Sequence, residues 1–78
     1  MNFENEAKRL GKRIQELRKK RGLRKEDMEE FGISYKYYQR IESPGSYPVN
    51  ITLKTLLKIA HALEVEVSDL FDFEDKKK

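Results

Sequence analysis

The chain is 78 residues long, enough for one small domain and too short to enclose a sizeable active site. It contains no cysteine, which excludes a disulfide framework and a cysteine-ligated zinc site. The net charge is +3, but bases predominate from Lys8 to Lys25 and acids from Glu64 to Asp75. A chain with this uneven distribution of charge can present its basic side to a polyanion. A basic run is also compatible with a merely solvated helix face.

The ends of the chain are polar and charged. No stretch approaches the ~20 apolar residues needed to cross a bilayer, and the acidic N-terminus does not resemble a signal peptide. We therefore expect a soluble, cytoplasmic protein that does not associate with membranes. One domain is expected over residues 6–73, with flexible charged termini at 1–5 and 74–78.

Three helices are predicted in the first half of the chain. Apolar residues recur at helical spacing from Leu10 to Leu17, which predicts a first helix over residues 6–21 that ends at Gly22. A second, shorter helix is predicted over residues 25–30, although no Ser, Thr, Asp or Asn caps its start. A tight turn at Gly32 follows it.

The third predicted helix runs from a serine cap to a glutamate, Ser34–Glu42. Tyr38 and Ile41 share one face of this helix and are expected in the core. Ile33 precedes the cap and stands at the spacing of a hydrophobic staple with Tyr38. The opposite face is polar, so one side of the helix remains available to a ligand.

The second half of the chain predicts a loop and two further helices. Residues 43–50 contain two prolines and a glycine, which excludes a helix there. A fourth helix is predicted over 52–63, with a wide apolar face that includes Leu53 and Leu57. The chain is therefore expected to be all-α.

A fifth short helix is predicted over residues 69–73, capped by Ser68. Leu70 and Phe71 are expected to face inward from it.

No residue pattern predicts catalysis or metal binding. The consecutive acids near residue 27 are not spaced like a calcium loop, and His61, the single histidine, has no evident partner for acid–base chemistry. We therefore expect that the protein is not an enzyme and that it needs no metal ion and no cofactor.

The order of the elements is the strongest functional signal. A short helix, a glycine turn and a capped helix follow one another, which is the plan of a helix-turn-helix. A helix fits the major groove of DNA, which is about 12 Å wide, and its first turns reach the base edges. The pattern predicts sequence-specific binding to double-stranded DNA, with Ser34–Glu42 as the recognition helix.

Several short motifs follow one another along the chain in an order that is typical of a known family. They are Gly11–Arg18, Gly22–Leu23, Gly32–Ser34, Ile41–Glu42 and Thr55–Leu63, followed by Val65, Asp69, Leu70 and Phe71. With this set, the chain resembles the lambda-repressor-like (Cro/CI, or Xre-type) family of regulators over residues 8–71. The stretch Asn50–Leu56 is also similar to restriction–modification controller proteins. The resemblance implies a compact five-helix domain that binds a DNA operator as a transcriptional repressor or controller.

Three features depart from the family pattern. Arg24 and Lys25 stand where the family has Ser or Thr followed by Gln. The segment Met28–Gly32 is one residue short, so we expect the second helix to end early, with Phe31 filling the junction. The loop Ser43–Ile51 is longer than usual.

The resemblance implies roles for residues of the third helix and the loop. Tyr35, Lys36 and Arg40 occupy outward positions, where Lys36 and Arg40 can donate to guanine. Further expected DNA contacts are Lys25, Ser34, Tyr37, Gln39, Ser46, Tyr47 and Asn50. For Tyr37, a half-buried position and a phosphate contact remain equally compatible with the sequence.

Two further groups have structural roles by resemblance. Arg18 and Glu42 match a partly buried salt bridge of relatives and are not assigned to the DNA site. Val67, Phe71 and Phe73 match a region through which relatives dimerise on DNA, or they simply close the small core. We expect a homodimer, at least on DNA.

Two other functions compete with this interpretation. The same fold can serve as a protein-interaction module, such as an antitoxin or a coactivator-like adaptor. The basic first helix could also bind RNA or DNA without sequence preference.

Overall fold

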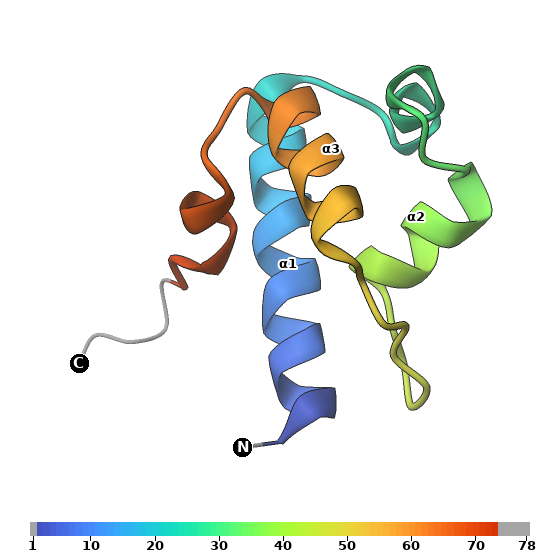
Figure 1. The fold of residues 1–78 in the computed structure, drawn as a ribbon, viewed down its shortest axis with the longest axis vertical. Coiled ribbons are helices and arrows are strands. Elements are labelled where there is room, and N and C mark those ends of the chain that lie inside the picture. Colours follow the sequence, from blue (N-terminus) through green and yellow to red (C-terminus); the bar gives the residue numbers. More distant parts are fainter. Residues whose placement is uncertain (1, 74–78) are drawn as a thin grey trace.

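The structure is a computed structural model in which residues 2–73 are described (Figure 1). These residues form three α-helices and two 3-10 helices, with no strand among them: α1 (Phe3–Arg21), η1 (Lys25–Phe31), α2 (Tyr35–Glu42), α3 (Leu53–Leu63) and η2 (Val67–Phe71). The all-α class is thus confirmed for this part of the chain, although only three of the five expected helices are α-helices. Among the described helices, none is long and apolar enough to cross a membrane. The expected flexible tail, 74–78, lies outside the described residues.

Helix α1 is longer than its sequence pattern predicts. The side chain of Asn2 accepts a hydrogen bond from the backbone N–H of Asn5 at 3.0 Å, so the helix begins at Phe3 and includes residues expected to be flexible. It ends at Gly22, which has a φ of 80° as expected for a left-handed cap. Helix α1 contacts α2, α3 and η2 and is therefore the central element of the fold (Figure 1).

The second element, η1, is a 3-10 helix and not the expected α-helix. A 3-10 helix rises about 2.0 Å per residue, against 1.5 Å in an α-helix. The shortened segment can therefore cover the distance between its flanking turns with fewer residues. It ends at Gly32, whose φ of 85° also favours glycine. Phe31 is half-buried, and the centroids of its ring and the His61 ring are 6.1 Å apart in an edge-to-face arrangement.

The start of η1 is capped by a residue within it. The carboxylate of Asp27 accepts a hydrogen bond from the backbone N–H of Arg24 at 2.8 Å. This bond, followed by the one from the Arg24 side chain, lowers the pKa of the Asp27 carboxyl. A capping interaction thus exists at this end although the residue before the helix is none of the usual capping types.

The cap at Asp27 should make stability depend on pH. A carboxyl whose pKa is lowered by folding stabilises the fold above its unfolded pKa of about 3.9, and this contribution is lost as the pH falls through the lower, folded value. We expect Asp27→Asn to lower the melting temperature at pH 7 and to have a smaller effect at about pH 2. The matched control is Glu26→Gln, which removes a charge from the same turn. Equal effects of both variants at pH 7 would contradict the cap.

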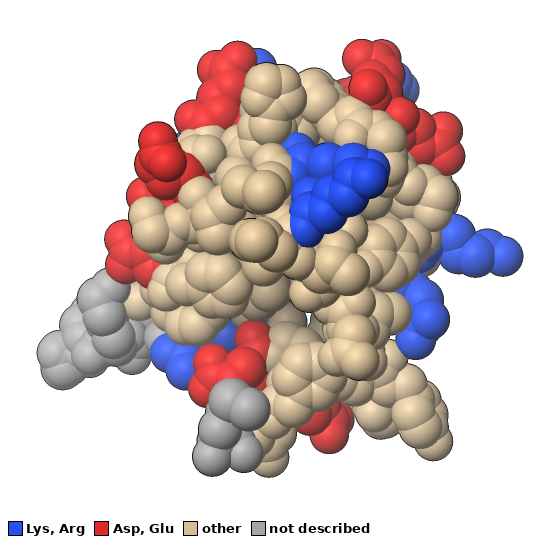
Figure 2. Space-filling view, viewed as in Figure 1, with Lys and Arg blue, Asp and Glu red and all other residues tan. Residues whose placement is uncertain are grey.

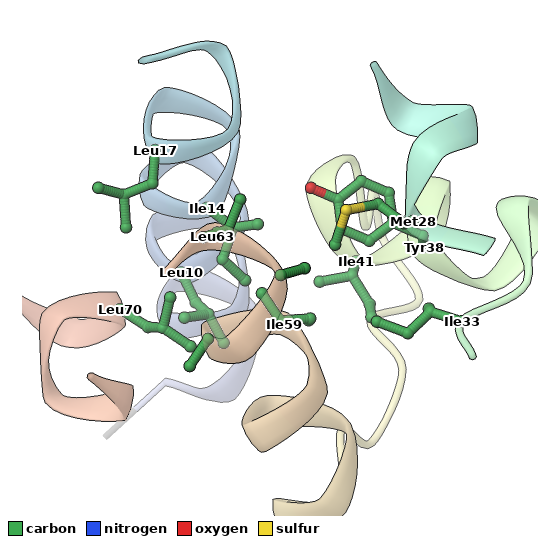
Figure 3. Close-up of a cluster of buried hydrophobic side chains, with 12 residues drawn as sticks. Leu10, Ile14, Leu17, Met28, Ile33, Tyr38, Ile41, Ile59, Leu63 and Leu70 are labelled. Atoms are coloured by element: carbon green, nitrogen blue, oxygen red, sulfur yellow. The ribbon is translucent and has the colours of Figure 1, made fainter. Parts of the chain in front are cut away.

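The core lies between α1, α3 and the helix-turn-helix (Figure 3). Side chains of α1 face those of α3, with Leu70 of η2 on one side and Met28, Tyr38 and Ile41 on the other. The buried apolar residues are Leu10, Ile14, Leu17, Met28, Ile33, Tyr38, Ile41, Ile59, Ala60, Ala62, Leu63 and Leu70. The apolar stripe predicted for the first helix is therefore the stripe that α1 buries.

The prediction of a wide apolar face for the fourth helix, which is α3 in the structure, is partly wrong. Leu53 is 66% exposed and Leu57 is 52% exposed, whereas Ile59 and Leu63 are buried. An α-helix turns by about 100° per residue, so the stripe of Leu53 and Leu57 lies about 120° away from that of Ile59 and Leu63. Packing one stripe against the core leaves the other in solvent.

The last helix is displaced from its predicted position. Element η2 spans Val67–Phe71 and starts after Glu66, whose backbone N–H donates to the Asp69 carboxylate at 2.9 Å, so Ser68 is not its cap. Leu70 is fully buried as expected, but Phe71 is 48% exposed. Consecutive side chains of a 3-10 helix point about 120° apart, so both cannot face the core.

Candidate nucleic-acid interface

One face of α2 is held in the core. Tyr38 and Ile41 are 0% and 2% exposed, as predicted, and Ile33 beside the helix start is 3% exposed. Helix α2 therefore has one orientation relative to α1, which determines which side chains point outward.

A buried ionic cluster fixes the C-terminal end of α2 against α1. The guanidinium of Arg18 donates from Nε to Glu42 Oε2 at 2.6 Å and from Nη2 to Glu42 Oε1 at 3.2 Å. A third bond runs from Arg18 Nη1 to the Leu23 carbonyl at 2.9 Å. The hydroxyl of Tyr38 also donates to the Glu42 carboxylate. Paired bonds of this kind are stronger and more directional than neutral ones.

The electrostatics of this cluster follow from its geometry. Hydrogen bonding to Glu42 raises the pKa of Arg18. Burial, and then the hydrogen bond to Glu42, raises the pKa of Tyr38. The sequence suggested the pairing of Arg18 with Glu42 but not the role of the Tyr38 hydroxyl. The i, i+4 spacing of Tyr38 and Glu42 on one helix was the available signal.

Two side chains cap the N-terminal end of α2. The Oγ of Ser34 accepts a hydrogen bond from the backbone N–H of Tyr37 at 3.2 Å, as its position predicts. The Glu29 carboxylate accepts from the backbone N–H of Tyr35, also at 3.2 Å. This second cap was missed, because it crosses the Gly32 turn and has no local sequence signature.

The outward face of α2 is polar and rich in hydrogen-bond donors. Lys36, Gln39 and Arg40 are exposed, and Tyr35 is 36% exposed. A shallow hollow of about 310 Å³ lies on this face, lined by Tyr35, Lys36, Gln39, Arg40 and Ser43. Figure 2 shows Lys and Arg side chains projecting on the right, where Figure 1 places α2, and acidic side chains along the upper margins.

The loop that follows α2 folds back onto it. Arg40 Nη2 donates to the carbonyl of Tyr47 at 2.9 Å, and the Tyr37 hydroxyl donates to the carbonyl of Asn50 at 3.3 Å. Ser46, Tyr47 and Asn50 are exposed, and the loop projects beyond the end of α2 (Figure 1). The structure therefore brings the loop candidates next to α2, by hydrogen bonds from α2 side chains to loop carbonyls that sequence reasoning missed.

The remaining candidates lie on other elements. Lys25 is half-buried at the first residue of η1. Phe71 is half-exposed on η2, while Val67 and Phe73 are half-buried. The rings of Phe71 and Phe73 meet edge to face at 6.3 Å. Figure 1 shows η2 and α2 on opposite sides of α1.

Together, η1, the Gly32 turn and α2 form a helix-turn-helix whose second helix is buried on one side and polar on the other. A family model described as helix-turn-helix, of the Cro/CI type, matches residues 14–70. Because this match covers most of the chain, the protein belongs to this family of DNA-binding transcription regulators. No curated protein and no solved structure gives a significant match.

Proposed function

We propose that this protein regulates transcription as a repressor or controller, by placing α2 in the major groove of a specific operator. The observation that carries this proposal is the two-sided character of α2. Its inner side is locked by the core and by the Arg18–Glu42 pair, while its outer side exposes Lys36, Gln39 and Arg40. A rigid helix with outward donors has the form that major-groove reading requires.

The chemistry of the outer face favours particular bases. Lys36 and Arg40 donate only, which suits guanine O6 and N7, and Gln39 can both donate and accept, which suits adenine. Tyr35 can contact a thymine methyl group or a phosphate. We therefore propose that each half-site contains guanine opposite Lys36 or Arg40.

Other residues are proposed to contact the sugar-phosphate backbone. Lys25 and Ser34 stand at the starts of the two helices of the motif, and Ser46, Tyr47 and Asn50 lie on the adjacent loop. Such contacts set register and affinity without reading sequence. The Tyr37 hydroxyl, in contrast, already donates to Asn50, which favours a structural role for it.

We propose that the protein binds DNA as a homodimer through Val67, Phe71 and Phe73. The exposed ring of Phe71, which meets the ring of Phe73 edge to face, supports this, because covering apolar area in an interface removes it from water. The patch lies across α1 from α2, so it leaves the outer face of α2 free for DNA (Figure 1). Family members of this architecture bind half-sites one helical turn apart, about 34–36 Å.

One observation favours a second candidate function. The exposed Leu57 and the half-buried Phe31 line an open groove of about 610 Å³, whose other lining residues are Glu30, Lys54, Lys58 and His61. Exposed apolar side chains that share a groove are typical of protein-binding surfaces. A protein-interaction module of the adaptor or antitoxin type is therefore the alternative.

Selection of bound sequences from random duplex DNA tests the proposed function. The regulator is expected to enrich an inverted repeat with guanine in each half-site. Binding without enrichment, together with a steep dependence on salt, would instead indicate non-specific nucleic-acid binding. Absence of binding to any duplex would favour the protein-interaction module.

The contribution of Arg40 can be tested on the selected operator. Arg40→Ala is expected to lower specific affinity by about 1–3 kcal/mol, or about 5- to 150-fold, and to relax the preference at one base pair. Binding to the operator and its single-base variants measures both effects. Lys19→Ala, an exposed cation on α1, is the control and should leave base preferences unchanged. An equal loss on every sequence would reduce Arg40 to a phosphate contact.

A further inference from the structure

We propose that residues 43–50, here called the latch loop, are a positioning element that orients the guanidinium of Arg40 for base reading. In this proposal Tyr37 is a positioning residue, because its hydroxyl holds the loop and the loop holds Arg40. The inference rests on the proposed function of α2 and adds a determinant of specificity that need not touch a base.

The latch loop is fastened to α2 at two points. Arg40 Nη2 donates to the Tyr47 carbonyl at 2.9 Å, and the Tyr37 hydroxyl donates to the Asn50 carbonyl at 3.3 Å. Tyr37 and Arg40 are three residues apart, which places them on neighbouring positions of one helix side. The loop is therefore bonded to two side chains of α2 that lie about one helical turn apart.

The backbone of the latch loop is restricted in sequence. Pro44 and Pro48 each fix a φ angle, and Gly45 has a φ of 63°, in the region that favours glycine. The side chain of Tyr47 is 80% exposed, so the loop offers Arg40 its carbonyl and not its ring. A restricted loop tied down by Tyr37 holds that carbonyl in a defined place.

The chemistry of arginine makes this arrangement useful for reading DNA. A guanidinium carries five N–H donors in one plane, so a bond to the Tyr47 carbonyl leaves donors available for a guanine. Arg40 also lines the hollow on the outer face of α2, where a base edge would enter. Holding the plane of the group in advance reduces the side-chain ordering that binding would otherwise require.

Tyr37→Phe tests the proposal, because it removes one oxygen atom from the fastening and leaves Arg40 in place. Discrimination at the base pair read by Arg40 is expected to fall about 3- to 10-fold, with affinity for non-specific DNA unchanged. Lys19→Ala, on α1 and away from the outer face of α2, is the control for discrimination. Tyr35→Phe is the control for the order of the loop only, because the Tyr35 side chain is itself proposed to contact DNA. It removes the same hydroxyl from the same helix, and within the described structure no hydrogen bond joins Tyr35 to the loop.

A double-mutant cycle separates positioning from direct contact. In an Arg40→Ala background, Tyr37→Phe should have no further effect on discrimination, because the group that it positions is gone. If Tyr37 contacted a phosphate instead, Tyr37→Phe would weaken binding equally on all sequences and independently of Arg40. That result would overturn the proposal.

A measurement on the free protein completes the test. Backbone 15N order parameters of residues 45–50 are expected to be near the rigid value of about 0.85, and to fall towards about 0.6 in Tyr37→Phe but not in Tyr35→Phe. Unchanged order parameters would contradict the fastening. If the wild-type protein binds DNA selectively and Tyr37→Phe discriminates between bases equally well, this inference alone is overturned. If the wild-type protein binds DNA without selectivity, the proposed function is overturned as well.

Discussion

Glu42→Ala is expected to destabilise the protein by about 3–5 kcal/mol, because it leaves a buried guanidinium without its counter-charge. The side chain of Glu42 is fully buried and accepts hydrogen bonds from Arg18 and from Tyr38. Since native proteins have total stabilities of only about 5–15 kcal/mol, a loss of this size removes a large share of the total and should lower the melting temperature markedly. Thermal or urea unfolding followed by circular dichroism measures the effect.

An exposed ion pair of nearly equal length provides the control. Arg21 Nη2 and Glu64 Oε2 are 2.7 Å apart, against 2.6 Å for the buried pair, but their side chains are 39% and 69% exposed. Solvent screens such a pair, so Arg21→Gln should cost no more than about 1 kcal/mol. If Glu42→Ala unfolded at the same temperature as the wild-type protein, the central role of the buried cluster would be wrong.

Gly11→Ala is expected to destabilise the fold by about 1–3 kcal/mol and to weaken DNA binding as well. A Cβ atom on Gly11 would lie 2.5 Å from the Ile41 carbonyl oxygen and 2.8 Å from that of Glu42. These are backbone atoms at the end of α2 and cannot rotate away as a side chain can. The helices must therefore separate, and the outer face of α2 moves with them.

The sign of the change in unfolding free energy in Gly11→Ala distinguishes two physical effects. Helix propensity alone predicts that alanine in the middle of α1 stabilises the protein by about 1 kcal/mol. The close approach of α1 and α2 predicts the opposite. A raised melting temperature in Gly11→Ala would show that the two helices do not meet at this glycine. The unfolding experiment used for Glu42→Ala decides between the two signs.

Features that depend on neighbouring residues could be predicted from the sequence. The stripe from Leu10 to Leu17 identifies the buried side of α1 because helical period depends only on spacing. Gly22 and Ser34 mark helix ends because caps act within a few residues. The location of α2 and its outward donors follows from the same signals.

Features that depend on which surfaces meet could not be predicted in this way. The exposure of Leu57 on α3 is decided by the stripe that packs against α1, and apolar character alone does not choose between stripes. The prediction that Phe71 faces inward was wrong for a related reason. Neighbouring side chains of a short helix point in different directions, and Leu70 is the one that packs in the core.

The features of the candidate site also separate into local ones, which the sequence predicts, and tertiary ones, which it does not. The sequence by itself determined the order of helices, the cap of α2 and the residue types on its outer face, because these are set by spacing and by local hydrogen bonding. Only the tertiary structure decided that Glu29 caps α2 and that Arg40 donates to the Tyr47 carbonyl. Those bonds join segments separated by a turn or a loop, and their formation depends on how the connecting backbone bends.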